Sequence, residues 1–166
     1  MHKQSFEREE LLQCGKGNLF GPDSLRQPLP DMLMLDRITH ISKEGGKYGE
    51  GTVTAELDIH PELWFFSCHF ETDPVMPGSL GMDGLSQLVG FYLGWRGYTG
   101  RGRALGVKKI KFKGEVLPTS KKITYVLDVK QLRKGKMIIA LADGAIYTKN
   151  AVICTAEDLS VAVFKK

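Results

Sequence analysis

A histidine and an aspartate are the two side chains of this sequence whose surroundings best suit proton-transfer chemistry. His69 follows the aromatic run at 64–66, and Asp83 lies in the apolar stretch that follows Pro77-Gly78. An imidazole titrates near neutral pH and can accept a proton. A carboxyl group in apolar surroundings keeps its proton and can donate it. The two residues are therefore candidates for a general base and a general acid.

Each of the two residues also has a structural interpretation, and composition alone leaves it open. His69 could be a half-buried strand histidine that is hydrogen-bonded to a backbone carbonyl. Asp83 could be a partner of the positive end of a helix dipole. The residue types therefore identify the two candidates, but they do not decide whether each has a catalytic or a structural role.

The segment at 79–95 predicts the element that would position this chemistry. It has the length of a helix, contains no proline and carries apolar residues around most of its circumference, so we expect a buried helix. Its first amides have no intrahelical acceptor, and the Gly78 amide could therefore bind a developing oxyanion. Gln87 lies four residues after Asp83, where its amide could hold the carboxylate.

Two other kinds of site use the same segment and are disfavoured. A metal site from Cys68, His69 and Asp73 has suitable ligand types, but adjacent strand residues point to opposite faces and Asp73 precedes a proline. Ser79 lacks the glycine-flanked pattern of a hydrolase nucleophile, and Cys68 would point away from His69. We therefore expect neither a metal nor a covalent nucleophile.

The rest of the chain predicts one α+β domain over 1–166. A short first helix is expected at 5–14, capped by Ser5 and ended by Gly15 or Gly17, and an irregular segment follows at 18–31. Alternating patterns at 32–42 and 52–59 indicate a hairpin, and similar patterns continue to the end of the chain. Several antiparallel strands and one buried helix indicate a sheet that wraps the helix.

Composition and charge indicate where the protein is expected to be found and what kind of partner it could bind. The chain has 166 residues, a formal net charge of +4, and three widely spaced cysteines that we expect to be reduced. It has no membrane span, and its first residues are charged where a signal peptide would be apolar, so we expect a cytoplasmic protein. Basic residues gather in "RGRALGVKKIKFKG" and "KQLRKGK", which could face an acidic partner. No added segment of a nucleic-acid-binding type is present.

The segment "WFFSCHFETDPVMPGSLGMDGLSQLVGFYLGW" resembles the active-site segment of the bacterial β-hydroxydecanoyl-acyl carrier protein dehydratase/isomerases. The similarity extends over nearly the whole chain through "LFGP", "MLMLDRI", "AELDI", "GRALGV", "KFKGEVLPT" and "LADG". It implies a hot-dog fold, in which a curved antiparallel sheet wraps a long helix, and a homodimer with two shared active sites. It also implies that His69 of one subunit works with Asp83 of the other, without a metal or a cofactor.

The resemblance further implies a role for each residue of the site. His69 would remove a C2 proton from a 3-hydroxyacyl thioester, and protonated Asp83 would assist departure of the 3-hydroxyl as water. The Gly78 amide would steady the thioester oxygen, and the Val75 carbonyl would orient the imidazole. The same histidine would then move the trans-2 double bond to cis-3, in fatty acid biosynthesis. An acyl carrier protein would dock on a basic segment formed by Arg133, Lys134 and Lys136.

Two departures from the family pattern bear on isomerisation and acyl-chain length. The family has cysteine after "MPG" and then "DAMWQL", whereas this chain has Ser79 and "DGLSQL". Ser86 in place of tryptophan and Gly84 in place of alanine remove volume, so we expect a differently shaped pocket. The alternatives are a hot-dog acyl thioesterase, against which the His69–Asp83 pair argues, and a non-catalytic module that binds acyl thioesters.

Overall fold

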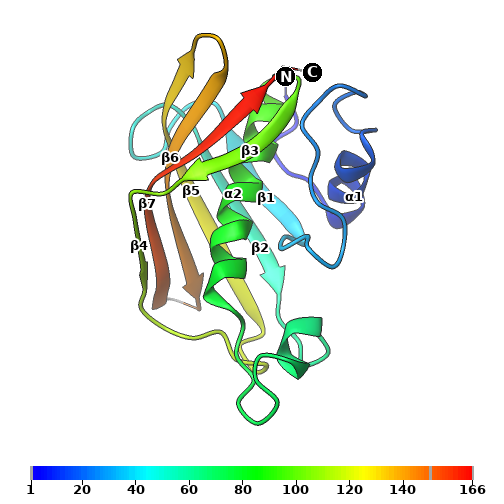
Figure 1. Ribbon diagram of the computed structural model, residues 1–166, viewed down its shortest axis with the longest axis vertical. Helices are drawn as coiled ribbons and strands as arrows, with labels where there is room; N and C mark the ends of the chain where they lie inside the picture. The colour runs from blue at the N-terminus through cyan, green and yellow to red at the C-terminus, as the bar shows by residue number, and fades with distance from the viewer. Residues whose placement is uncertain (1, 150, 166) are drawn as a thin grey trace.

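A curved antiparallel sheet wraps one long helix in the computed structural model, which describes residues 2–149 and 151–165 (Figure 1). Within those residues seven strands form one sheet in the order β1-β2-β5-β6-β7-β3, and β4 also pairs with β7. The strands are β1 (Arg37–Ser42), β2 (Thr52–Asp58), β3 (Arg101–Gly106), β4 (Lys109–Phe112), β5 (Lys122–Lys134), β6 (Ile138–Thr148) and β7 (Ala151–Phe164). This arrangement confirms the predicted α+β hot-dog fold.

The central helix α2 (Gly78–Trp95) crosses the concave face of the sheet. Twelve of its residues are buried, and among them are glycines and large aromatic side chains. A helix that is apolar around most of its circumference needs packing partners on all sides, and the sheet, the segment 18–31 and the N-terminal residues supply them. The predicted buried helix is confirmed, and it begins at Gly78 rather than residue 79.

The glycines of α2 allow sheet side chains to approach its backbone. A Cβ atom at Gly81 would lie 2.9 Å from Ile146 Cδ1, and one at Gly84 would lie 2.6 Å from the Tyr125 hydroxyl. These contacts are closer than side-chain carbons tolerate, so the helix sits deeper in the sheet than one with alanine at these positions could.

The predicted hairpin near the N-terminus is confirmed, and the first helix is displaced. Strands β1 and β2 pair antiparallel on either side of the loop at 43–51. Helix α1 (Arg8–Lys16) begins later than predicted, because Glu7 rather than Ser5 is the N-cap. Glu7 and Glu10 form a reciprocal capping box there, and the helix ends at Gly17, whose φ is 83°.

The segment at 18–31 has no regular helix or strand and packs over α2, as expected. Gln27 is buried, and its Nε2 atom donates to the Gln87 carbonyl over 2.9 Å. No helix in the described part of the chain is long and apolar enough to cross a bilayer.

Candidate active site

His69 lies in a loop that precedes α2, and one hydrogen bond fixes its ring. The residues before it form the short 3-10 helix η1 (Trp64–Ser67), so the structural interpretation of His69 as a strand residue does not hold, although its bond to a backbone carbonyl does. The His69 Nδ1 atom lies 2.7 Å from the Val75 carbonyl oxygen. Since a carbonyl only accepts, Nδ1 carries the proton, and Nε2 of the neutral ring keeps a free lone pair. A half-buried imidazole in this tautomer has one nitrogen that could accept a proton.

Backbone hydrogen bonds hold the loop around His69. The His69 amide donates to the Phe65 carbonyl over 2.9 Å, and the Val75 amide donates to the His69 carbonyl over 2.8 Å. The Phe70 ring stacks against the imidazole, with 4.0 Å between ring centroids. The residues between His69 and Val75 form a turn, which is why two residues so near in sequence can face each other.

Asp83 lies on α2, and Gln87 holds its carboxylate. Gln87 Nε2 donates to Asp83 Oδ2 over 2.7 Å and to the Met32 carbonyl over 2.9 Å, while Oε1 accepts from the Met34 amide over 2.9 Å. Gln87 is only 7% exposed. Both N–H donors and the oxygen of the Gln87 amide thus have partners, which fixes one Asp83 oxygen relative to the segment that precedes β1.

Gly78 begins α2 and is covered by an aromatic ring that the sequence analysis missed. A Cβ atom at Gly78 would lie 2.6 Å from Phe112 Cε1, so only glycine allows this packing. Behind it lies a narrow apolar cavity of about 30 Å³ lined by Met76, Pro77, Gly78, Gly81, Phe112, Gly114, Val116, Ile123, Ile146, Ile153 and Cys154. The alternation of lysines with Ile110 and Phe112 indicates which face of β4 is apolar. Nothing in the sequence indicates that Phe112 contacts Gly78.

A second missed residue, Tyr125, occupies the space that Gly84 leaves. Its ring is fully buried, and its hydroxyl has no hydrogen-bond partner among the described residues. Burial raises the pKa of this phenol, and the nearby Asp83 carboxylate raises it further. Gly84 therefore adds no open space at this position, because the Tyr125 ring fills it.

The structure does not join every predicted site residue. No hydrogen bond connects His69 with Asp83 within the described protomer, and the second Asp83 oxygen has no partner there. The β5–β6 hairpin, which carries Arg133, Lys134 and Lys136, lies at the opposite end of the molecule from the start of α2 (Figure 1). Cys68 and Asp73 do not join His69 in a metal-ligand cluster, and the described residues contain no other such cluster.

Comparison with known proteins places these features in a family and a fold. Residues 27–157 match the FabA-like domain. Among solved structures, the dehydratase heterocomplex ApeI:P from Xenorhabdus doucetiae is similar, with a TM-score of 0.65 and 15% identity over 84% of this chain and 89% of that chain. A mutant thioesterase from Pseudomonas aeruginosa gives a TM-score of 0.57 and 15% identity over 99% and 98% of the two chains.

A third structure is an uncharacterised protein from Pyrococcus horikoshii. Its TM-score is 0.53 at 11% identity, over 82% of this chain and 88% of that chain. At these identities the three structures support the fold alone.

Proposed function

Since the chain belongs to the FabA-like domain family, we propose that it dehydrates (3R)-3-hydroxyacyl thioesters carried by an acyl carrier protein, giving trans-2-enoyl thioesters. The observation that carries this proposal is the hydrogen bond between His69 Nδ1 and the Val75 carbonyl. In the neutral form of this half-buried ring the bond leaves Nε2 free to accept a proton, and Val75 lies three residues before Gly78, where α2 begins. Removal of a proton next to a carbonyl requires a base, and it also requires hydrogen-bond donors that stabilise the charge on the carbonyl oxygen. The first amides of α2 are the proposed donors.

The reaction balances with two side chains and one backbone amide. His69 Nε2 takes the C2 proton, and the Gly78 amide stabilises the negative charge that grows on the thioester oxygen. The C3–O bond then breaks as protonated Asp83 gives its proton to the hydroxyl, which leaves as water. The proton on His69 returns to Asp83 before the next turnover, so the site needs no cofactor.

We also propose the second family reaction, isomerisation of the trans-2 product to cis-3. His69 would remove a C4 proton and a proton would be added at C2, so the double bond moves without net change in composition. Ser79 lies beside Gly78 in the first turn of α2, and Ser86 donates to the Met82 carbonyl over 3.3 Å. These two serines are the departures from the family pattern that bear on this step, and the ratio of cis-3 to trans-2 product measures how well C4 is held.

The proposed site is shared by two subunits of a homodimer. Within the protomer His69 and Asp83 are not connected, and large apolar side chains are exposed near the site and on the edge strand β3. Phe70 is 53% exposed, Phe112 is 56% exposed and Leu105 is 51% exposed. Apolar surface of this kind is typical of an interface, and a second copy would cover it and bring its own Asp83.

The acyl carrier protein is the proposed partner, and Arg133, Lys134 and Lys136 its proposed docking cluster. All three are exposed. Arg133 Nε donates to Gln131 Oε1 over 3.1 Å, whereas neither lysine forms an ion pair with an acid among residues 2–149 and 151–165. The hairpin lies far from the start of α2, and therefore from both Asp83 and the His69 loop of its own protomer, which leaves the cluster exposed at the other end of the molecule.

The experiment is incubation with 3-hydroxyacyl-carrier substrates of several lengths, followed by identification of the products by mass spectrometry. We expect trans-2-enoyl and cis-3-enoyl thioesters from the wild type and no turnover from His69→Ala or Asp83→Asn. Free acid as the product would indicate a thioesterase instead. Binding without turnover would indicate the non-catalytic module.

A further inference from the structure

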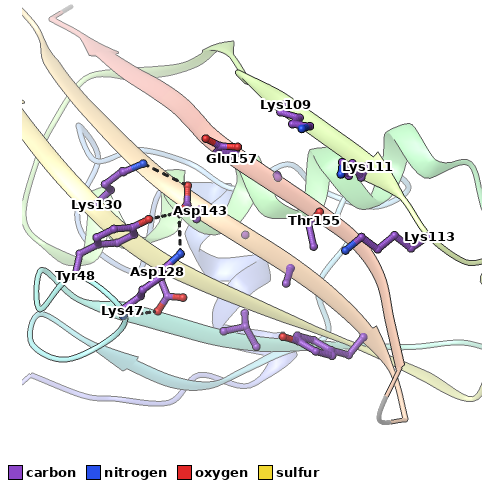
Figure 2. A pocket seen from close by; sticks show the side chains of 15 residues that line it. Lys47, Tyr48, Lys109, Lys111, Lys113, Asp128, Lys130, Asp143, Thr155 and Glu157 are labelled. Atoms are coloured by element: carbon purple, nitrogen blue, oxygen red, sulfur yellow. Dashed lines mark hydrogen bonds and ion pairs between the residues drawn. The ribbon is translucent and has the colours of Figure 1, made fainter.

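A groove on the outer face of the sheet, away from α2, is bordered by lysines from three parts of the chain (Figure 2). Its volume is about 430 Å³. On β5 the groove residues Val126, Asp128 and Lys130 alternate with side chains buried against α2, which places the groove on the opposite face from the proposed active site.

One wall of the groove carries uncompensated positive charge. Lys109, Lys111 and Lys113, here called the lysine row, occupy alternate positions on and directly after β4, and all are exposed. None of the three forms an ion pair with a described residue. Alternate strand positions lie about 6.7 Å apart on one face, so the three ammonium groups project from the same wall. In Figure 2 the Lys113 side chain turns toward Thr155, over the groove.

Three acids line the groove, and two of them have cationic partners, while the third, Asp128, accepts from the Lys47 backbone amide over 3.0 Å. Asp143 accepts from the Tyr48 hydroxyl and from the Asp158 amide over 3.0 Å, and it lies 3.9 Å from Lys130 and 4.0 Å from Lys47. Glu157 forms an ion pair of 3.2 Å with Lys108, whose ammonium is not part of the groove lining. The charge of the lysine row is therefore available to a ligand.

The floor gives the groove its depth and an apolar surface. It is formed by the Val126 and Ala145 side chains and by the backbone of β6 and β7 at Gly144 and Ala156, whose side-chain positions face the core. Tyr147 lies at the end nearest Lys113, since its β7 partner Val152 adjoins Ile153, the residue to which the Lys113 amide donates. The volume falls in the range of small-molecule sites and is too small for a docked protein helix.

We propose that this groove binds a nucleotide that carries two or more phosphate groups. The phosphates would lie along the lysine row, where ammonium groups provide charge-assisted hydrogen bonds, and the base would lie on the apolar floor against Tyr147. A free nucleoside polyphosphate and the nucleotide end of coenzyme A share this chemistry. The proposal concerns a separate face and does not rest on the proposed dehydratase activity.

Isothermal titration calorimetry tests the site with ATP, coenzyme A, adenosine and tripolyphosphate as probes. We expect ATP or coenzyme A to bind and adenosine to bind at least roughly tenfold more weakly, because it lacks the charge-assisted bonds. The tighter of the two nucleotides identifies the source of the ligand. Tripolyphosphate that binds as tightly as either nucleotide, or no binding of ATP and coenzyme A, would overturn the proposal.

Two variants separate a built site from general attraction to a basic protein. Changing the lysine row to alanine should weaken nucleotide binding roughly tenfold or more. The matched control changes Arg133, Lys134 and Lys136 to alanine, which removes the same charge outside the groove and should leave binding nearly unchanged. Ala145→Leu keeps the charge but fills the floor, and it should also weaken binding. Equal losses in the two triple variants, or full binding by Ala145→Leu, would refute the site.

Discussion

At His69 a single backbone carbonyl oxygen determines which ring nitrogen carries the proton in the neutral imidazole. A neutral imidazole carries its proton on either nitrogen, and only the form protonated on Nδ1 leaves Nε2 free to act as a base. The Val75 carbonyl at 2.7 Å selects that form. The Asp83 carboxylate is fixed at one oxygen only. The buried Gln87 donates to that oxygen, and the other oxygen has no partner within the described protomer.

Gln87 is therefore expected to be a positioning residue for Asp83. Gln87→Leu keeps the side-chain size but removes the bond to the carboxylate, and we expect kcat to fall roughly tenfold or more with little change in KM. It also leaves the Met34 amide and the Met32 carbonyl unpaired, so the free energy of unfolding should fall by about 1–3 kcal/mol. Steady-state kinetics and urea unfolding measure the two effects.

Gln27→Leu is the matched control for this change. Gln27 is also buried, but it donates to the Gln87 carbonyl and does not touch Asp83. It should lose stability and keep turnover. If the two variants lose kcat alike, Gln87 acts only through the stability of the fold.

At the scale of elements, the outer strand pair β1–β2 is held by a cluster of charges. Arg37 donates to Glu56 over 2.9 Å and makes two hydrogen bonds to Asp58, and Lys122 from β5 reaches Glu56 over 2.9 Å. These bonds connect three adjacent strands on the outer face of the sheet. They also make the stability of this edge depend on pH.

The hydrogen bond from Arg37 lowers the pKa of Asp58 below its ordinary value of 3.8. Because the folded state depresses this pKa, the contribution to stability is complete above about pH 4 and is lost as the pH falls through the folded-state pKa. We expect Arg37→Met to lower Tm at neutral pH, and the difference from the wild type to shrink below pH 3.8.

Thermal unfolding followed by circular dichroism between pH 2 and pH 7 measures this dependence, at about the pH range where carboxylates titrate. Arg103→Met is the control, because in the described part of the chain Arg103 forms its one side-chain hydrogen bond to the Gly102 carbonyl and pairs with no acid. A constant difference in Tm between Arg37→Met and the wild type at every pH would contradict the assignment.

At the scale of the whole molecule, a shared site predicts complementation between inactive subunits. His69→Ala and Asp83→Asn should each be inactive dimers. A mixture that exchanges subunits forms hybrid dimers in which one site has both an intact His69 and an intact Asp83. With random exchange half of the dimers are hybrids, so about a quarter of wild-type activity should return.

Native mass spectrometry verifies the exchange, and dehydration assays measure the recovery. The unmixed variants under the same conditions provide the baseline. Complete exchange without recovered activity would show that the site does not combine His69 of one subunit with Asp83 of the other.

Docking of the carrier is the second prediction at this scale. Acyl carrier proteins are acidic, so reversing the charge of Arg133, Lys134 and Lys136 should raise KM for a carrier-linked substrate. The increase should diminish at high salt, because screening weakens the introduced repulsion. A coenzyme A or pantetheine thioester lacks the acidic surface and should be much less affected.

The lysine row provides a matched control, because its charge reversal changes the same number of charges on a different surface. Equal increases in KM for the carrier-linked substrate would show that total charge, rather than the hairpin, attracts the carrier. Equal effects on the carrier-linked and pantetheine substrates would place the hairpin in the fold or the pocket.

The sequence by itself determined the parts of this protein that depend on local pattern. The buried helix at 78–95 follows from apolar residues around its circumference, and the β1–β2 hairpin follows from alternation on either side of a glycine-rich turn. His69, Gly78, Asp83 and Gln87 could be named for the same reason, because their residue types and neighbours carry the chemical argument. The capping box formed by Glu7 and Glu10 is also a local pattern, but Ser5 is the residue predicted as the N-cap.

Only the tertiary structure decided the contacts between elements distant in the chain. Phe112 covers Gly78, and Tyr125 fills the space at Gly84, because the curvature of the sheet brings β4 and β5 against particular turns of α2. The groove beside the lysine row likewise requires β4, β5, β6, β7 and the loop before β2 to meet on one face. Alternation indicates which residues share a face of a strand, but it does not indicate which strands are neighbours. That choice depends on how the whole sheet closes around the helix, and it fixes both the surroundings of the site and the groove on the opposite face.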